Sequence, residues 1–192
     1  IVGMLYNYQL LKYADEDGVA AYGTLMYVEF IFISVFIGYA IGSAPIISYH
    51  FGADNHAELK NMLKKSLILM SLAGVAMLII SEALAFPLAH IFVGYDEKLL
   101  EMTVHGFRVF SLMFPLASIN IFASSFFTAL NNGGVSAAIS FLRTFVFKLA
   151  AVLILPLLFK LDGIWWATIV AELFAFLLSI GLVAAKKKKY GY

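Results

Sequence analysis

Residues 163 to 185, Gly-Ile-Trp-Trp-Ala-Thr-Ile-Val-Ala-Glu-Leu-Phe-Ala-Phe-Leu-Leu-Ser-Ile-Gly-Leu-Val-Ala-Ala, form an apolar run with a single charged residue, Glu172, and Lys186 to Lys189 follow directly. A helix rises about 1.5 Å per residue, so roughly 20 apolar residues cross a hydrocarbon core of about 30 Å. The run therefore predicts a membrane-spanning helix with a basic flank. Glu172 would lie at lipid depth, where a costly ionisable group indicates a functional site facing protein or a water-filled cavity.

The same composition extends over the whole chain. Of its 192 residues, 62% are hydrophobic and 13% are charged, and the mean hydropathy is +0.92. A soluble domain of this size does not bury so much apolar surface, so we expect an all-α integral membrane protein. The absence of cysteine excludes disulfides and thiolate metal sites. The one dense basic cluster, Lys186 to Lys189, adjoins a span, so no nucleic-acid partner is expected.

No motif in the chain is typical of catalysis. The sequence contains no His-Glu-x-x-His, no Gly-x-x-x-x-Gly-Lys phosphate loop and no Gly-x-Ser-x-Gly elbow. We therefore expect a protein that is not an enzyme, has no catalytic residues and holds no metal or organic cofactor.

Apolar segments and turn signals predict a bundle of six transmembrane helices, the first of them truncated. Residues 1 to 11 are apolar but too short to cross a bilayer, and the chain does not start with Met, so we expect a fragment of a longer protein. The expected helices are 1–13 (partial), 21–48, 66–89, 107–129, 137–159 and 163–185, followed by a basic cytoplasmic tail, 186–192.

Local patterns predict where helices start, end and touch. Asn55 followed by Glu58 resembles a capping box and predicts a helix start, and Asn131 to Gly134 predicts a turn. The second helix is expected to end at Pro45, with turns over 48–55, and Asp96 to Glu101 is expected to be a charged loop. A further pattern, Gly38-x-x-x-Gly42, favours close helix contact.

The basic residues predict an orientation. The loops on one side hold Lys60, Lys64, Lys65, Arg143 and Lys186 to Lys189, and the opposite loops hold Lys12, Lys98, Arg108 and Lys160. The positive-inside rule places the richer side, including the C-terminus, in the cytoplasm. Arg143 is expected at that interface, and Lys148 either snorkels there or enters a cavity.

Polar residues within the predicted spans are the candidate site. On the helix face of Glu172 lie Trp165, Thr168 and Ser179, which form a polar stripe around the carboxylate. Glu172 suits a group that binds and releases a proton or a cation, but a structural carboxylate bonded to a neighbouring helix fits the pattern equally well. Both interpretations stay open.

Two further polar features allow a functional and a structural interpretation. Glu29 has apolar neighbours on its own helix face, so any partner must come from another helix; otherwise it meets water at the outer interface. Asn120, Ser124 and Thr128 recur every four residues, and such a ridge either joins helices by hydrogen bonds or lines a substrate surface.

Several strings resemble the multidrug and toxic compound extrusion (MATE) transporters. Pro45-Ile-Ile-Ser-Tyr-His-Phe-Gly-Ala53 resembles the signature that ends the family's eighth helix, and Leu161-Asp-Gly-Ile-Trp-Trp-Ala167 resembles the entry to its twelfth. Similar strings of the seventh, tenth and eleventh helices are Asn7 to Leu11, Phe107 to Phe110 with Pro115, Phe126 to Asn131, and Ser140 to Arg143. The resemblance runs in order over essentially the whole chain.

The resemblance implies a twelve-helix transporter of two six-helix lobes, in which residues 1–192 are the C-terminal lobe and the missing partner is an N-terminal six-helix lobe. It implies a multi-pass protein of the cell membrane with both termini in the cytoplasm. The implied function is secondary active efflux of small organic, often cationic, lipophilic compounds, coupled to inward Na⁺ or H⁺ flow by alternating access.

The chain departs from one pattern of this family. Some members place cation-binding acids on the seventh and tenth helices, whereas these helices here offer Asn7 and Gln9, and Asn120. The resemblance therefore implies no cation site of that kind, and coupling could reside outside this chain. The candidates for transport or ion coupling are Glu172, Glu29 and Asn120; those for cavity lining are Asn7, Gln9, Ser124, Thr128, Trp165, Thr168 and Ser179.

Two other functions remain as alternatives. A related flippase for lipid-linked oligosaccharides or peptidoglycan precursors would need buried cations facing the cavity to bind pyrophosphate, and only Arg143 and Lys148 are candidates. A non-transporting scaffold, or a half-size protein that pairs with itself, is the third hypothesis.

Overall fold

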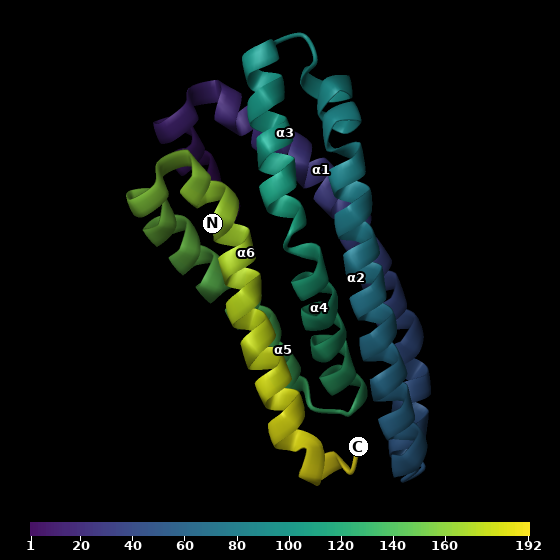
Figure 1. The fold of residues 1–192 in the computed structure, drawn as a ribbon. Helices are drawn as coiled ribbons and strands as arrows, with labels where there is room; N and C mark the ends of the chain where they lie inside the picture. The colour runs from purple at the N-terminus through teal and green to yellow at the C-terminus, as the bar shows by residue number, and fades with distance from the viewer.

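The helices of the chain pack side by side in an elongated bundle (Figure 1). A computed structural model describes all residues, 1–192. The elements are α1 (Val2–Gly52), α2 (His56–Val93), α3 (Glu97–Ser111), α4 (Phe114–Ala129), α5 (Gly133–Phe141), the π-helix η1 (Leu142–Phe147) and α6 (Lys148–Tyr190). Within the bundle, α3 continues in the same direction into α4 (Figure 1). The prediction of an all-α fold is confirmed.

The two longest helices each contain a break in the backbone. In α1 the break lies at Ala14 and Asp15, whose φ angles are −148° and 50°, and in α6 it lies at Lys160, whose φ is 52°. The first break lies between the expected helices 1–13 and 21–48, and the second between 137–159 and 163–185. At the second break the chain turns back on itself at one end of the bundle (Figure 1).

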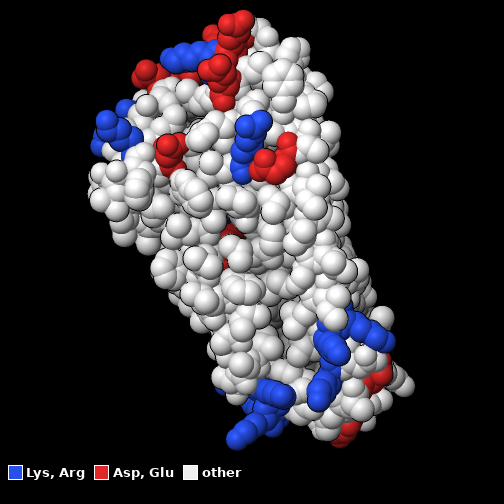
Figure 2. Space-filling model, viewed as in Figure 1, with Lys and Arg blue, Asp and Glu red and all other residues white.

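Three helices are long and apolar enough to cross a membrane. They are Val2–Gly52, His56–Val93 and the helical stretch Gly133–Tyr190, the first and last of which contain the breaks just described. The bent pair α3 and α4, which meet at 47°, makes a fourth if it is counted as one span. On the face shown in Figure 2 the charged residues gather toward both ends of the bundle, and the surface between them is almost free of charge. This distribution suits a bilayer, which excludes charged side chains from its core.

Three expectations about helix ends are wrong. α1 continues through Pro45 to Gly52, the charged stretch after Asp96 is the first turn of α3, and α6 continues through the lysines of the expected tail. Inside a membrane an interrupted helix leaves backbone groups without partners, so the chain keeps its helix and forgoes one hydrogen bond at the proline.

The turns predicted from asparagines are confirmed, and each asparagine acts as a cap. The side chain of Asn55 accepts a hydrogen bond from the Glu58 amide at 3.1 Å, and that of Asn132 accepts one from Val135 at 3.3 Å. Asp96 does the same for Leu99 at 3.0 Å. These side chains satisfy amides that the first turn of a helix leaves free.

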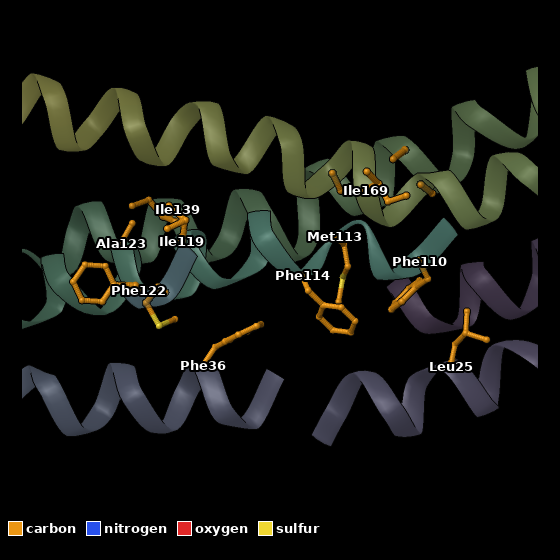
Figure 3. Packing of buried hydrophobic residues seen from close by; sticks show 14 of the residues in the cluster. Leu25, Phe36, Phe110, Met113, Phe114, Ile119, Phe122, Ala123, Ile139 and Ile169 are labelled. Carbon is orange, nitrogen blue, oxygen red and sulfur yellow. The ribbon is translucent and has the colours of Figure 1, made fainter. Parts of the chain in front are cut away.

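α4 is the centre of the apolar core. Its Phe114 and Phe122 are fully buried and meet Phe32 and Tyr39 of α1, with ring centroids 5.2 and 6.2 Å apart. Figure 3 shows these α4 side chains between α1 and the helices of the C-terminal half, and the layer continues through Met113, just before α4, to Phe110 of α3. The core therefore holds α4, and with it Asn120, in a fixed position.

The close helix contact predicted at Gly38 and Gly42 does not occur, because a Cβ at either position would have no neighbour within 4 Å. The close approach lies instead at Gly74 of α2, where a Cβ would come within 2.7 Å of Pro115 Cα. Small residues allow helix backbones to approach closely, and here Gly74 lets α2 pack on the start of α4.

Substitution of Gly74 by valine is therefore expected to lower stability by about 1–3 kcal/mol, because the side chain would overlap the backbone of α4. The thermal midpoint of the purified protein in detergent is the measurement. Gly42→Val is the matched control and is expected to leave the midpoint nearly unchanged. Equal losses in the two variants would contradict the packing.

The C-terminal residues tie the turns at the lysine-rich end of the bundle together. His56 Nδ1 at the start of α2 lies 3.0 Å from the carbonyl oxygen of Tyr190, and Asn132 Nδ2 donates a hydrogen bond of 2.7 Å to the Tyr190 hydroxyl. The Tyr192 hydroxyl donates to the carbonyl of Val183 at 3.0 Å. Burial raises the pKa of Tyr192 to about 12, so this donor keeps its proton at neutral pH.

Candidate functional site

Glu172 lies at the centre of a buried polar cluster formed by three elements. Its side chain is completely buried, and Arg143 Nε of η1 lies 2.9 Å from its Oε1 and 2.8 Å from its Oε2. Asn120 Nδ2 of α4 donates to Glu172 Oε2 at 2.8 Å and to the Glu172 carbonyl at 3.0 Å. The carboxylate is thus bonded to two other helices, as the structural interpretation of the sequence requires.

The cluster combines strong attraction with a large cost of removing charges from water. A buried ion pair stabilises the fold little more than apolar residues of the same volume would. Removing one partner leaves an unpaired buried charge, which lowers the stability of the fold by about 3–5 kcal/mol. Hydrogen bonds from Asn120 to the carboxylate reduce the cost of burying Glu172. The cluster therefore fixes how α4, η1 and α6 are arranged.

The expectation that Arg143 lies at the cytoplasmic interface is wrong. Its side chain is 15% exposed and pairs with Glu172 inside the bundle. Arg143 belongs to η1, where the wider i→i+5 hydrogen bonding of a π-helix replaces the regular α-helix. Without Arg143, the lysine-rich end keeps Lys60, Lys64, Lys65 and Lys186 to Lys189.

A second ion pair joins Glu29 of α1 to Lys148, the first residue of α6. The Lys148 Nζ lies 3.9 Å from Glu29 Oε1, and the side chains are 21% and 15% exposed, respectively. The partner of Glu29 thus comes from another helix, as its apolar surroundings on α1 predicted. No hydrogen bond fixes the Glu29 carboxylate, so this pair is looser than the pair of Arg143 and Glu172.

Glu29 and Lys148 line a cavity of about 300 Å³, here called the acidic cavity. Tyr6 and Tyr22 stand in its wall, stacked with ring centroids 5.0 Å apart and planes 7° from parallel. The Tyr6 hydroxyl lies 3.0 Å from Thr168 Oγ1, one helical turn before Glu172, and so connects the acidic cavity to the helix of the buried cluster.

Hydroxyl groups form a second polar feature beside Arg143. Ser124 Oγ of α4 lies 2.9 Å from Ser136 Oγ and 2.8 Å from Ser140 Oγ of α5, and Thr128 Oγ1 lies 2.7 Å from Ser136 Oγ. Ser124, Thr128 and Ser140 line a groove of about 330 Å³, here called the hydroxyl groove, together with Ser125 and Arg143.

The remaining residues proposed from the sequence lie apart from these cavities. Asn7 is exposed, whereas Gln9 is buried and its Nε2 donates to the Val152 carbonyl at 3.3 Å. Trp165 and Ser179 are buried, and neither Trp165 Nε1 nor Ser179 Oγ has a hydrogen-bond partner. Thr168 is bonded to Tyr6, so of the stripe around Glu172 it alone reaches another polar side chain.

A run of polar residues on the fifth expected helix was not among the residues predicted from the sequence. Ser136, Ser140, Thr144 and Lys148 follow one another at intervals of four residues, and Thr144 Oγ1 donates to the Ser140 carbonyl at 2.6 Å. The spacing of Ser136 and Ser140 was a visible signal, because residues four apart share a face of an α-helix, but the π-helix from Leu142 to Phe147 changes this register for Thr144 and Lys148. Ser140 of this run lines the hydroxyl groove together with Ser124 and Thr128 of α4, whereas Thr144 and Lys148 line the acidic cavity.

Comparison with known proteins gives a consistent result. The MatE family model matches residues 1–154. The probable multidrug resistance protein YoeA of Bacillus subtilis (strain 168) is 24% identical over 199 residues, which cover 99% of this chain and 41% of YoeA. The chain therefore spans less than half the length of this relative.

Solved structures of transporters share the fold. An outward-facing multidrug resistance MATE family transporter of the MOP superfamily superimposes with a TM-score of 0.87 at 18% identity, over 97% of this chain and 43% of that one. The Vibrio cholerae MATE transporter VcmN in its bent form gives a TM-score of 0.86 at 16% identity, over 98% of this chain and 44% of that one.

Proposed function

The chain belongs to the MatE family, and from this premise we propose that it is the C-terminal six-helix lobe of a twelve-helix secondary transporter. In this proposal the transporter exports organic, often cationic, lipophilic compounds by alternating access, driven by inward flow of Na⁺ or H⁺. The breaks at Ala14, Asp15 and Lys160 support the count of six, because they divide α1 and α6 into antiparallel halves.

One observation carries the proposal: the Glu29 carboxylate borders an open cavity and is held only by an ammonium 3.9 Å away. An intramembrane acid next to a cavity marks an ion or substrate path. Glu172, in contrast, already accepts hydrogen bonds from Arg143 and Asn120 and is completely buried. We therefore assign the exchange of a proton or Na⁺ to Glu29 and a structural role to Glu172.

Competition for Glu29 gives a simple coupling step. When the carboxylate binds H⁺ or Na⁺, it no longer balances Lys148, and the ion pair between α1 and α6 weakens. When an organic cation enters the cavity, its charge attracts the carboxylate in the same way, so substrate and coupling ion exclude each other. Mutually exclusive binding at one acid gives antiport when the transporter changes its access only with that site occupied.

The wall of the acidic cavity suits an organic cation. The stacked rings of Tyr6 and Tyr22, together with Phe30, present aromatic surface beside the carboxylate. Ring faces attract cations by about 0.5–2 kcal/mol, and the attraction is largest where water is excluded. A lipophilic cation would thus satisfy both the charge and the apolar surface of the cavity.

The flippase alternative is disfavoured by the partners of the two intramembrane cations. Arg143 pairs with Glu172 and Lys148 pairs with Glu29, so each cation faces a carboxylate. A pyrophosphate group needs several positive charges that are not already balanced.

One end of the bundle carries Lys60, Lys64, Lys65 and Lys186 to Lys189 (Figure 1), and we propose that this end faces the cytoplasm.

The test is transport by the full-length protein in proteoliposomes. A lipophilic fluorescent cation should accumulate against its gradient when an opposed Na⁺ or H⁺ gradient is imposed, and an ionophore that dissipates the gradient should abolish accumulation. Movement of a lipid-linked pyrophosphate without any ion gradient would favour the flippase instead. Movement of neither compound would favour the scaffold.

A further inference from the structure

We propose that the hydroxyl groove binds the carboxylate group of an amphipathic organic compound, with Arg143 and the groove hydroxyls as its donors. This inference deepens the proposed function and rests on it, because it adds a second chemical feature to the transported compound. It concerns a different cavity from the one that contains Glu29.

Arg143 has unused donors on the side of the groove. Its Nε donates to both carboxylate oxygens of Glu172, whereas its two terminal nitrogens donate no hydrogen bond within the protein. These nitrogens are not sealed in the interior, and Arg143 lines the groove. A guanidinium has five donors in a planar fork, so one edge can hold Glu172 while another meets a second carboxylate.

Hydroxyl groups around the guanidinium complete the site. Ser124 and Ser140, from two different helices, approach each other to 2.8 Å, and Thr128 stands one turn from Ser124. A hydroxyl rotates to donate to whichever acceptor is present, so these groups can turn from each other to a bound oxyanion. Ser140 and Thr128 are exposed to the groove, which leaves them accessible.

The apolar residues of the hydroxyl groove and the charge balance around Arg143 indicate which class of ligand fits. Ile37, Ile41 and Ile121 line the groove and offer apolar surface for the body of the compound. Arg143 is already balanced by Glu172, and the nearest intramembrane cation, Lys148, pairs with Glu29. One partly neutralised guanidinium suits a single negative charge better than a phosphate dianion, so a carboxylate fits best.

The experiment is a binding titration on the full-length protein, with fluorescence polarisation as the readout. The two matched probes are a carboxylate-bearing rhodamine and the methyl ester of the same dye. Arg143→Lys keeps a positive charge beside Glu172 but removes the edge of the guanidinium that would bind the carboxylate of the probe. We expect it to raise the Kd of the acid about ten-fold and that of the ester less than about two-fold.

A second variant keeps the test valid if Arg143→Lys folds poorly. Ser140→Ala removes one exposed hydroxyl and is expected to raise the Kd of the acid about three-fold, again without affecting the ester. Ser34→Ala is the matched control, because Ser34 is exposed and bonds only to the Ile31 carbonyl of its own helix at 2.6 Å.

The outcomes separate this inference from the proposed function. Selective loss of acid binding in Arg143→Lys or Ser140→Ala supports the inference, even if no ion gradient drives transport of either dye. Equal losses for acid and ester, or no loss for either dye, overturn it, even if ion-driven transport is observed.

Discussion

Replacement of Arg143 by methionine is expected to lower the free energy of unfolding by about 3–5 kcal/mol, the largest stability change that we expect from one substitution in this chain. Glu172 would remain completely buried with Asn120 as its only side-chain partner, and its charge would be uncompensated. Thermal unfolding of the purified full-length protein in detergent measures the effect.

The double variant Arg143→Met/Glu172→Met distinguishes a lost charge balance from lost packing. With both charges removed, the site becomes apolar, and most of the lost stability should return. Lys98→Met is the control, because Lys98 and Asp17 form an exposed pair 3.7 Å apart whose loss should cost less than about 1 kcal/mol. Equal effects of Arg143→Met and Lys98→Met would contradict the buried cluster.

Glu29→Gln is expected to abolish ion-driven accumulation of substrate, reducing it by about 100-fold or more, because glutamine binds neither a proton nor Na⁺ as a carboxylate does. The amide keeps the shape of the side chain, so the protein should fold and reach the membrane normally. Initial rates of dye uptake into proteoliposomes under an imposed gradient provide the measurement.

Glu16→Gln is the matched control for this prediction. Glu16 is an exposed acid beside the break in α1, away from the acidic cavity, so its neutralisation should leave transport unchanged. Lys148→Met should act differently from both, because it frees Glu29 from its partner and alters the affinity for the ion without removing the carboxylate. Normal accumulation by Glu29→Gln would leave Glu29 without a role in coupling.

Features that depend on local sequence were predicted well. Apolar runs predicted the all-α membrane class, Asn55 predicted a helix start and Asn131 to Gly134 predicted a turn. The side chains of Asn55 and Asn132 bond to amides only three residues away. The motif strings indicated the family that the comparisons then showed. In each case the feature depends on residues that are close to one another in the sequence.

Features that depend on contacts between helices could not be predicted in the same way. Arg143 was expected at the cytoplasmic interface, but it lies in a π-helical turn, and both it and Lys148 meet carboxylates of other segments. Gly38 and Gly42 have the spacing of a packing motif, yet the close contact is at Gly74. Composition does not reveal which face of a helix meets a neighbour.

The central claim is that Glu29 exchanges the coupling ion against the substrate. It is tested most directly by measuring ion movement itself, as uptake of labelled Na⁺ or of protons into proteoliposomes when substrate is supplied on the opposite side. We predict substrate-dependent ion uptake by the wild-type protein and none by Glu29→Gln, in which the cationic substrate should also bind more weakly because the amide carries no charge. Substrate-dependent ion uptake by Glu29→Gln at the wild-type rate would contradict the claim.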